Sequence, residues 1–447
     1  MIRKAIADPG ARSDSVAIAE LLRRVCMVGD RTQPEFELIE YLEKIRGSRT
    51  GLCSGILTRM DFIGNLPSAK LRDLKAPSSL DYILIFTVMV LVGFGLIMVY
   101  STTGVVSQER MGDALYCAKR QSLSALLGLV LMIIAAKMPV SLIKKLSPIL
   151  LPACLIMLIF PLVPGIADRA GGASRWVKLG PIRFQPAEFV KVGVVVFMAG
   201  FFARHEMKVS SFFHGIIKPF GLVGVLAGLL LLQPDFGSSV VILLVVLAMA
   251  LACGVRLSHL AVCSVGLAIV LGVLVAISPY RMMRIVSFLN PFSDASGKGY
   301  QLIQSLIAVG SGQVVGVGLG EGQQKLFFLP AAHTDFIFAV ISEELGFVGG
   351  ISVLIGFLVL LWRGLLLAKQ VRHDTFLFAL TVGLTMIIVA PALLNVGVVI
   401  GVLPTKGLVL PLVGYGGSSL MACLAVVGLL VRIRREYVMG IGARAWG

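Results

Sequence analysis

Stretches of roughly 18 to 25 apolar residues, the length needed to cross a bilayer as a helix, recur along the chain from Asp81 onward. Backbone N–H and C=O groups in lipid must be paired internally, so such stretches fit only helices or a closed barrel. Each stretch is continuously apolar rather than alternating, which favours helices. With 57% hydrophobic and 14% charged residues, the sequence predicts an all-α polytopic membrane protein with about ten transmembrane helices.

Charged residues, Gly and Pro mark where the apolar stretches end. The predicted spans are 82–103, 121–137, 147–164, 185–203, 216–232, 237–253, 259–278, 335–362, 375–400 and 409–431. The longest loop, about 279–334, joins the seventh span to the eighth. The membrane domain is therefore 81–437, followed by a short C-terminal tail, 438–447. Residues 1–80 mix charges evenly and contain no apolar core of a signal peptide, so we interpret them as a loosely ordered N-terminal tail.

The distribution of Lys and Arg predicts the orientation of the spans. The chain has 40 Lys and Arg against 24 Asp and Glu, a net charge of +16. Many of these cations lie in connections on the side of the N-terminal tail: Lys137, Lys144, Lys145, Arg204, Lys208, Lys218, Arg256, Arg363, Lys369, Arg372, Arg432, Arg434 and Arg435. The positive-inside rule then places both termini in the cytoplasm and the longest loop outside.

The same distribution excludes other protein classes. No basic, aromatic-interleaved domain accompanies the positive charge, which argues against nucleic-acid binding. The seven cysteines are scattered and show no CxxC spacing. The sequence therefore predicts neither a metal site nor a disulfide framework.

Some cations lie in predicted outer loops, where the positive-inside rule does not expect them. The loop after the third span contains Arg175 and Lys178, and the turn before the tenth span contains Lys406. Either short outer loops tolerate these cations, or the side chains hold an anion such as a lipid phosphate. The longest loop adds the carboxylate of Asp294, within the polar stretch NPFSDASGKGYQ.

Charged residues also occur at the depth of the predicted spans, where each costs about 2.5–3.5 kcal/mol on insertion scales. Glu188 and Lys191 begin the fourth span at an i, i+3 spacing, which puts them on one face of the helix. Glu343 and Glu344 lie too deep in the eighth span to form a solvated face. Such residues form buried ion pairs or mark a functional site.

Three polar features near span ends have structural interpretations. Asp235 follows Pro234 and is expected to cap the sixth span, and Asp335 is expected to cap the eighth. The small residues at 416–419 allow close helix packing in the tenth span.

These residues leave two functions open. Asp294 can take a proton from an attacking hydroxyl while the outer cations stabilise a departing phosphate or pyrophosphate, which fits group transfer from a phospholipid-linked donor. A transporter would instead bind an anionic substrate among the paired charges of the fourth and eighth spans. The large outer loop favours chemistry at the membrane surface.

Four stretches in order resemble the signature segments of the SEDS family, named for shape, elongation, division and sporulation. They are WVKLGPIRFQPAEFVK, LLQPDFGSS, the run from NPFSDASGKGYQ to HTDFIFAVISEELGFVGG, and NVGVVIGVLPTKGLVLPLVGYGGSS. The resemblance extends from Asp81 to about Tyr437. It implies a peptidoglycan glycosyltransferase that polymerises lipid II on the outer face of the cytoplasmic membrane and releases undecaprenyl pyrophosphate.

The resemblance also implies roles for individual residues. The family's catalytic aspartate falls on Asp294, as general base toward the 4-hydroxyl of the acceptor sugar in an inverting transfer. The expected substrate-binding residues are Arg175, Lys178, Glu188, Lys191, Gln301, His333, Lys406, Ser418 and Ser419. Gly297 and Gly299 are expected to let the backbone turn sharply beside the substrate. Ala295 stands where many members have proline, which predicts a looser loop. No cofactor is evident, and a divalent cation would arrive only with the lipid pyrophosphate.

Within the family, the stretches PTKG and QPDFGSS resemble the division branch more than the elongation branch. This implies septal cell-wall synthesis in the inner membrane, with a cognate class B penicillin-binding protein and other division membrane proteins as partners. The partner's single helix is expected near the eighth and ninth spans. Alternatives are an elongation-type polymerase, a lipid II flippase, or a structural partner without chemistry. A polymerase depends on Asp294, whereas a flippase depends more on Glu188, Lys191, Glu343 and Glu344.

Overall fold

The computed structural model describes residues 80–163, 167–170, 173–179, 182–294, 297, 299–405 and 407–445. These residues belong to one compact unit, Ser78–Gly447. Of the predicted N-terminal tail, only Leu80 is among them, so that prediction lies outside the described residues.

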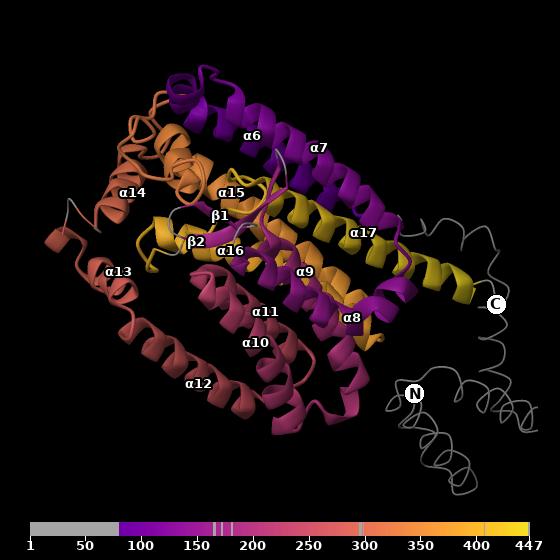
Figure 1. Cartoon of the computed structure of the whole chain (residues 1–447). Helices are drawn as coiled ribbons and strands as arrows, with labels where there is room; N and C mark the ends of the chain where they lie inside the picture. The colour runs from indigo at the N-terminus through magenta and orange to yellow at the C-terminus, as the bar shows by residue number, and fades with distance from the viewer. Residues whose placement is uncertain are drawn as a thin grey trace, which may run out of the picture. The chain divides into compact units, whose positions relative to one another are not determined.

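Long apolar helices make up most of this unit (Figure 1). They are α6 (Tyr82–Met111), α7 (Tyr116–Lys137), α8 (Val140–Ile159), α9 (Pro186–Arg204), α10 (Lys218–Leu232), α11 (Phe236–Ala252), α12 (Leu257–Ala276), α13 (Pro279–Leu289), α14 (Tyr300–Ser311), α15 (Ile337–Gln370), α16 (Thr375–Val399) and α17 (Gly417–Ala445). Short helical turns are η1 (Phe160–Leu162), η2 (Glu206–Lys208), η3 (Phe213–Ile217) and η4 (Pro291–Asp294). Helices α13 and α14 lie in the long connection between α12 and α15.

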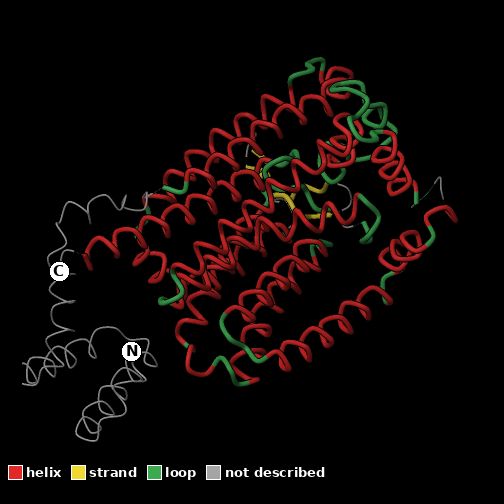
Figure 2. Tube along the Cα trace, turned by 180° about the vertical axis from the view of Figure 1, so that it is seen from behind, coloured by secondary structure: helices red, strands yellow, loops and turns green. Residues whose placement is uncertain are grey.

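The predicted architecture, an all-α polytopic membrane protein with about ten spans, is confirmed. Among the described residues, nine helices are long and apolar enough to cross a membrane. The remaining predicted span, the sixth, is α11, an apolar helix of 17 residues. The Asp235 side chain accepts a hydrogen bond from Ser238 N at the start of α11, so the predicted N-cap is confirmed. Figure 2 shows the helices side by side, with loops gathered at the two ends of the bundle.

Two boundaries of the last helix differ from the prediction. α17 begins at Gly417 rather than near residue 409. The preceding stretch is apolar but not helical, because Pro411 lacks a backbone N–H and Leu412 has a positive φ of 64°. At its other end α17 continues to Ala445, so helix extends through most of the predicted tail 438–447.

A small sheet was not predicted. Strands β1 (Ala167–Ala170), β2 (Ala173–Leu179) and β3 (Ile182–Phe184) form an antiparallel sheet in the order β1-β2-β3, within the loop after α8. The stretch ASRWVKL mixes polar and apolar residues without the strict alternation that predicts a strand. Its length is too short to stand out beside the long apolar stretches around it.

The helices differ widely in how much protein surrounds them. In both α9 and α16, 78% of the apolar window is buried, whereas in α12 the share is 6%. Helices α9 and α16 therefore form the core of the bundle. Helix α12 lies at its edge, where its side chains face the surroundings (Figure 1).

Two buried ion pairs join other segments to α6, one toward each end of the bundle. At the first, Arg363 Nε donates to both carboxylate oxygens of Asp81 at 3.1 and 3.0 Å, and Arg363 Nη2 donates at 2.7 Å. At the second, Lys325 Nζ lies 2.6 Å from Glu344 Oε1, and Ser101 Oγ donates to Glu344 at 2.8 Å. These contacts hold α6, α15 and the long connection together.

The separation of the two pairs matches the thickness of a bilayer. At about 1.5 Å per residue, Asp81 and Ser101 are about 30 Å apart along α6. The hydrocarbon core is about 30 Å thick. A bilayer core aligned with these two contacts would have Glu344 at one of its boundaries rather than at mid-depth. We call this end of the bundle, which carries the connection between α12 and α15, the loop end.

Helix α15 is broken at Gly346, just past Glu344, and the long connection forms hydrogen bonds with the backbone on both sides of the break. Gly346 has non-helical angles (φ 65°, ψ −163°). Phe347 N donates to Gln313 O at 2.9 Å and Val348 N to Val314 O at 3.2 Å, while Val317 N donates to Glu343 O at 3.0 Å. Backbone groups that lose their helical partners are thereby paired, as a low-dielectric environment requires.

Replacing Arg363 by Met leaves the Asp81 carboxylate buried without its ion-pair partner. Breaking a buried pair in this way costs about 3–5 kcal/mol, so Arg363→Met should lower the midpoint of thermal unfolding in detergent. The double variant Asp81→Asn/Arg363→Met removes both charges and should recover most of the loss. Equal midpoints for the wild type and Arg363→Met would contradict a stabilising role of the pair.

The packing of the long connection on α15 at the break predicts that two of its glycines differ in how far alanine there lowers stability. Gly316 and Gly320 both have a φ of +89°, so alanine meets the same backbone strain at each. At Gly316 the new Cβ would also lie 2.2 Å from Glu344 O, whereas at Gly320 no atom lies within 4 Å. We expect Gly316→Ala to destabilise the protein by about 1–3 kcal/mol more than Gly320→Ala, measured by unfolding in detergent. Similar losses at both sites would show that the connection does not pack tightly on α15.

Candidate functional site

The first turn of α9 holds an ion pair inside the bundle. Lys191 Nζ lies 2.8 Å from Glu188 Oε1, and the two side chains are only 8% and 12% exposed. The predicted pairing at i, i+3 spacing is confirmed. Mutual neutralisation lets both charges lie within the bundle.

Helix α17 begins beside this pair. Ser418 is buried, and its Oγ accepts a hydrogen bond from Gln185 N, just before α9, at 3.0 Å. Ser419 is half-buried. A Cβ at Gly417 would lie 2.6 Å from Ser124 Oγ of α7, so the small residues allow close helix packing as predicted.

Arg175, on β2, reaches the turn between α10 and α11. Its Nε donates to Gln233 O at 3.3 Å, another guanidinium nitrogen donates to Pro234 O, and Nη1 lies 4.0 Å from Asp235 Oδ1. The other oxygen of Asp235, Oδ2, is buried and has no hydrogen-bond partner among the described residues. Asp235 is also an electrostatic neighbour of Lys191. The sheet thus brings a guanidinium to the charged cluster at the start of α9.

A second carboxylate, Asp335, lies just before α15. Asn395 Nδ2 of α16 donates to Asp335 O at 2.8 Å, which anchors the backbone. A Cβ at Gly407 would lie 3.3 Å from Asp335 Oδ2, so the turn before α17 packs closely on the carboxylate. Burial raises the pKa of Asp335 to about 6, although a Thr334 hydrogen bond and the charge of Arg175 act in the opposite direction.

The prediction that Asp335 caps α15 is wrong. The N-cap is Phe336, and no side chain makes a capping hydrogen bond there. The Asp335 carboxylate instead lies in the field of two arginines, Arg175 and Arg284, from β2 and α13. Both guanidiniums favour its ionised form.

His333 lies between the long connection and the stretch before α17. Tyr415 N donates to His333 O at 2.9 Å, and the two ring centroids are 5.7 Å apart. The imidazole is half-buried, and burial lowers its pKa. Gln301 is half-buried in the first turn of α14.

Asp294 ends the turn η4 and is exposed. Gly297 N and Gly299 N both donate to Asp294 O at 3.2 Å, which closes a tight turn around this residue. A Cβ at Gly297 would lie 2.4 Å from the Asp294 carboxylate, and one at Gly299 would lie 2.1 Å from Pro291 O. The sharp turn predicted at these two glycines is present, and close contacts leave little room for a Cβ at either; their place beside a substrate stays a prediction. An exposed carboxylate is thus held on a compact backbone turn.

A different segment links Asp294 to the rest of the site. Arg284, on the helix that leads to η4, donates from Nη1 to Thr405 O at 3.2 Å. Thr405 directly precedes Lys406, which lies outside the described residues. Lys178 lies in β2 opposite Arg183, and its side chain is also outside the described part of the chain.

Sequence reasoning missed three members of this site. Arg284 is a cation in the long outer loop, Asn395 is an amide inside a span, and Asp335 was assigned to a cap. The amide was detectable, because a polar residue within an apolar span needs a partner. The role of Arg284 was not, because it depends on how α13 folds back toward the turn before α17.

The arrangement combines a polar surface with an apolar bundle. At the loop end, the cations Arg175 and Arg284 and the carboxylates Asp235 and Asp335 lie above buried apolar helices. Among the described residues, no group of three or more His, Cys, Asp or Glu side chains could hold a metal ion. These four charged groups thus balance one another, and Asp294 adds an exposed carboxylate in the same long connection as Arg284.

The raised pKa of Asp335 predicts how stability depends on pH. The folded state binds this proton more tightly than the unfolded chain does, whose aspartate titrates near 3.8. The resulting contribution to stability is present at low pH and is lost as the pH rises from about 4 through about 6. The unfolding midpoint of the wild type, relative to that of Asp335→Asn, should therefore fall between pH 4.5 and pH 7.5. A relative midpoint that rises over this range would contradict the assignment.

Comparison with known proteins gives a consistent family. The family model described as "Cell cycle protein", FTSW_RODA_SPOVE, matches residues 82–438. The chain is 42% identical over 361 residues to the "Probable peptidoglycan glycosyltransferase FtsW" of Coxiella burnetii, covering 80% of this chain and 97% of the relative. It is 38% identical over 359 residues to "Stage V sporulation protein E" of Bacillus subtilis, covering 80% and 98%.

Solved structures agree. A chain from structural work on "coordination of polymerization and crosslinking by a peptidoglycan synthase complex" is similar with a TM-score of 0.63 and 31% identity, covering 80% of this chain and 98% of that one. The rod shape determining protein RodA of Thermus thermophilus is similar with a TM-score of 0.57 and 27% identity, covering 80% and 97%. The family model spans most of the chain and the relatives are matched almost completely, so this chain belongs to the FtsW, RodA and SpoVE family of cell cycle proteins.

Proposed function

We propose that this chain is a peptidoglycan glycosyltransferase that polymerises lipid II for septal cell-wall synthesis. The observation that carries the proposal is the exposed Asp294 carboxylate, held on a glycine-closed turn at the loop end. The names of relatives such as the Coxiella burnetii protein support the activity and the division branch. An elongation-type polymerase is the alternative within the family.

In this proposal the loop end faces the outside of the cytoplasmic membrane, and both termini are cytoplasmic. The connections at the opposite end support this orientation, because they carry cations such as Arg204, Lys208 and Lys369. The sugars then meet Asp294 in water, while the prenyl chains stay in the bilayer. The protein would act in the inner membrane and collect at the division septum.

The chemistry requires a base on one side of the donor sugar and positive charge on the other. The Asp294 carboxylate accepts the proton of the acceptor 4-hydroxyl as that oxygen attacks the anomeric carbon of the donor. The bond from this carbon to the pyrophosphate oxygen breaks, and the configuration inverts. Undecaprenyl pyrophosphate leaves with its added negative charge, which Arg175, Lys178 and Lys406 are proposed to stabilise. A divalent cation would enter only with the pyrophosphate.

The remaining polar residues are proposed to position the substrate. The Glu188–Lys191 pair lies in the first turn of α9, and the hydrogen bond from Gln185 N to Ser418 Oγ joins the start of α9 to α17 at the loop end, where the head group of the donor would lie. Ser419, Gln301 and His333 can donate or accept hydrogen bonds from the sugars or the peptide.

A cognate class B penicillin-binding protein is the proposed partner, with other division membrane proteins and the lipid bilayer around it. The similarity to a chain of a peptidoglycan synthase complex supports a partner in cell-wall synthesis. The lipid-facing surfaces of α15 and α16 are where its membrane helix is expected.

The contacts of Glu343 and Glu344 weigh against a lipid II flippase. Glu343 accepts hydrogen bonds from Gln323 N at 2.9 Å and Gln324 N at 3.2 Å. Glu344 pairs with Lys325. Both carboxylates therefore fasten the long connection to α15. They are not free to bind a passing substrate, which removes half of the charges that a flippase would use.

The first test is polymerisation of labelled lipid II in liposomes, with the wild type and Asp294→Asn compared in the presence of the cognate penicillin-binding protein. Loss of a general base should slow polymerisation by about 10²–10⁴-fold. Asp113→Asn, at an exposed loop aspartate paired with Lys119, is the matched control and should keep wild-type activity.

Each outcome separates the hypotheses. Glycan polymer from the wild type and the control but not from Asp294→Asn supports the transferase. Equal polymer from all three would exclude Asp294 as the base. No polymer from any of them, together with movement of lipid II between leaflets, would favour the flippase. No polymer and no movement, with a stimulated penicillin-binding protein, would favour a structural partner.

A further inference from the structure

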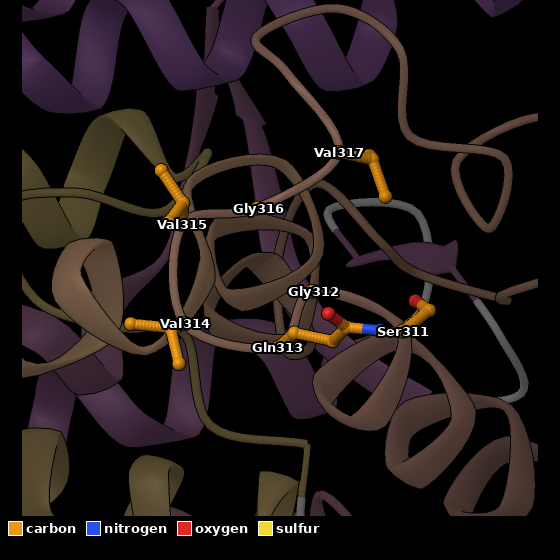
Figure 3. Close-up of a pocket in the computed structure, with 7 residues that line it drawn as sticks. All are labelled: Ser311, Gly312, Gln313, Val314, Val315, Gly316 and Val317. Carbon is orange, nitrogen blue, oxygen red and sulfur yellow. The ribbon is translucent and has the colours of Figure 1, made fainter.

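The long connection carries exposed apolar side chains, although the sequence predicts that it is an outer loop. Val314 and Val315 are 62% and 78% exposed. In Figure 3 both side chains point to the same side of the turn 311–317, away from its centre. A cavity of about 250 Å³ lies within this turn and is lined by Ser311–Val317 (Figure 3). The two valines therefore contribute little to a protein core.

The backbone of this turn lies beside the broken part of α15. Its hydrogen bonds to Phe347 N and Val348 N place Val314 at the level of residues just past Glu344. With the hydrocarbon core aligned on the Asp81–Arg363 pair and on the Ser101–Glu344 contact, which lie about 30 Å apart along α6, Glu344 is at one boundary of the core. The valines thus lie at the membrane boundary rather than in bulk water.

The turn also continues an apolar surface of α15. Phe347 and Val348, whose N–H groups bond to the turn, are exposed, and so are Ile355 and Leu358 further along the helix. Exposed apolar residues at this spacing form a stripe on one side of a membrane-spanning helix. In a bilayer that holds this chain without its partner, lipid covers such a stripe, and the same acyl chains would extend over the adjoining turn.

We propose that Val314 and Val315 insert into the leaflet at the loop end and form, with Phe347 and Val348, an apolar rim in contact with acyl chains. The rim anchors the connection that carries Asp294 to the membrane surface. Three backbone groups of the turn, Gln313 O, Val314 O and Val317 N, are paired with α15, which lowers the cost of placing the turn at this depth. The tight approach of Gly316 to Glu344 O keeps the turn at this depth.

Spin-label accessibility tests the insertion directly and does not depend on enzymatic activity. The full chain, with its native cysteines replaced, would carry one nitroxide at Val314→Cys or Val315→Cys in phosphatidylglycerol and phosphatidylethanolamine bilayers. Both side chains are exposed, so the label should not disturb the fold. Collision rates with oxygen, which concentrates in lipid, and with a water-soluble nickel chelate would be compared.

Two control positions calibrate the measurement. Ile355→Cys lies on the exposed stripe of α15 and should report lipid. Glu321→Cys is exposed in the same connection and should report water. We expect labels at 314 and 315 to resemble the label at 355, with at least severalfold more oxygen than nickel collisions relative to 321. Nickel access like that at 321 would overturn the proposal. So would poor access of both reagents, because protein rather than lipid would then cover the rim.

Discussion

The contact among Lys325, Glu344 and Ser101 joins three segments of this protein: the long connection, α15 and α6. A carboxylate at the edge of the hydrocarbon core is tolerated only when its charge is matched and its oxygens are hydrogen-bonded. Here Lys325 of the long connection supplies the opposite charge, and Ser101 of α6 donates a hydrogen bond to the carboxylate. The same contact therefore pairs a charge, fixes the level of α15 and ties down the segment that contains the proposed base.

The candidate site follows from this arrangement. The first turn of the buried helix α9 holds the Glu188–Lys191 pair inside the bundle. Arg175 comes from the sheet after α8 and Arg284 from α13, and both guanidiniums lie near Asp335. Asp294 is contributed by yet another segment and stays exposed. The proposed binding groups are thus built into the bundle, whereas the proposed base lies on an exposed turn.

Local features were predictable from the sequence, and features that depend on folding were not. Apolar length is a local property, so the spans were predicted, as were the Glu188–Lys191 pair and the Asp235 cap. The break at Gly346 was not predicted, because the sequence around a glycine in a helix does not show whether another segment hydrogen-bonds to the helix backbone there. The site of Asp335 also escaped, since its neighbours Arg175 and Arg284 lie far away in sequence. Lys406 and the side chain of Lys178 stay predictions.

The burial of α12 bears on how this chain can vary between species. Only 6% of its apolar window is buried, against 78% in α9. Substitutions in α9 must preserve shape, because neighbouring side chains fill the surrounding space. Lipid is fluid and accepts many shapes, so α12 needs only apolar composition and sufficient length. Sequence drift should accordingly be fast along α12 and slow along α9, although both helices cross the same membrane.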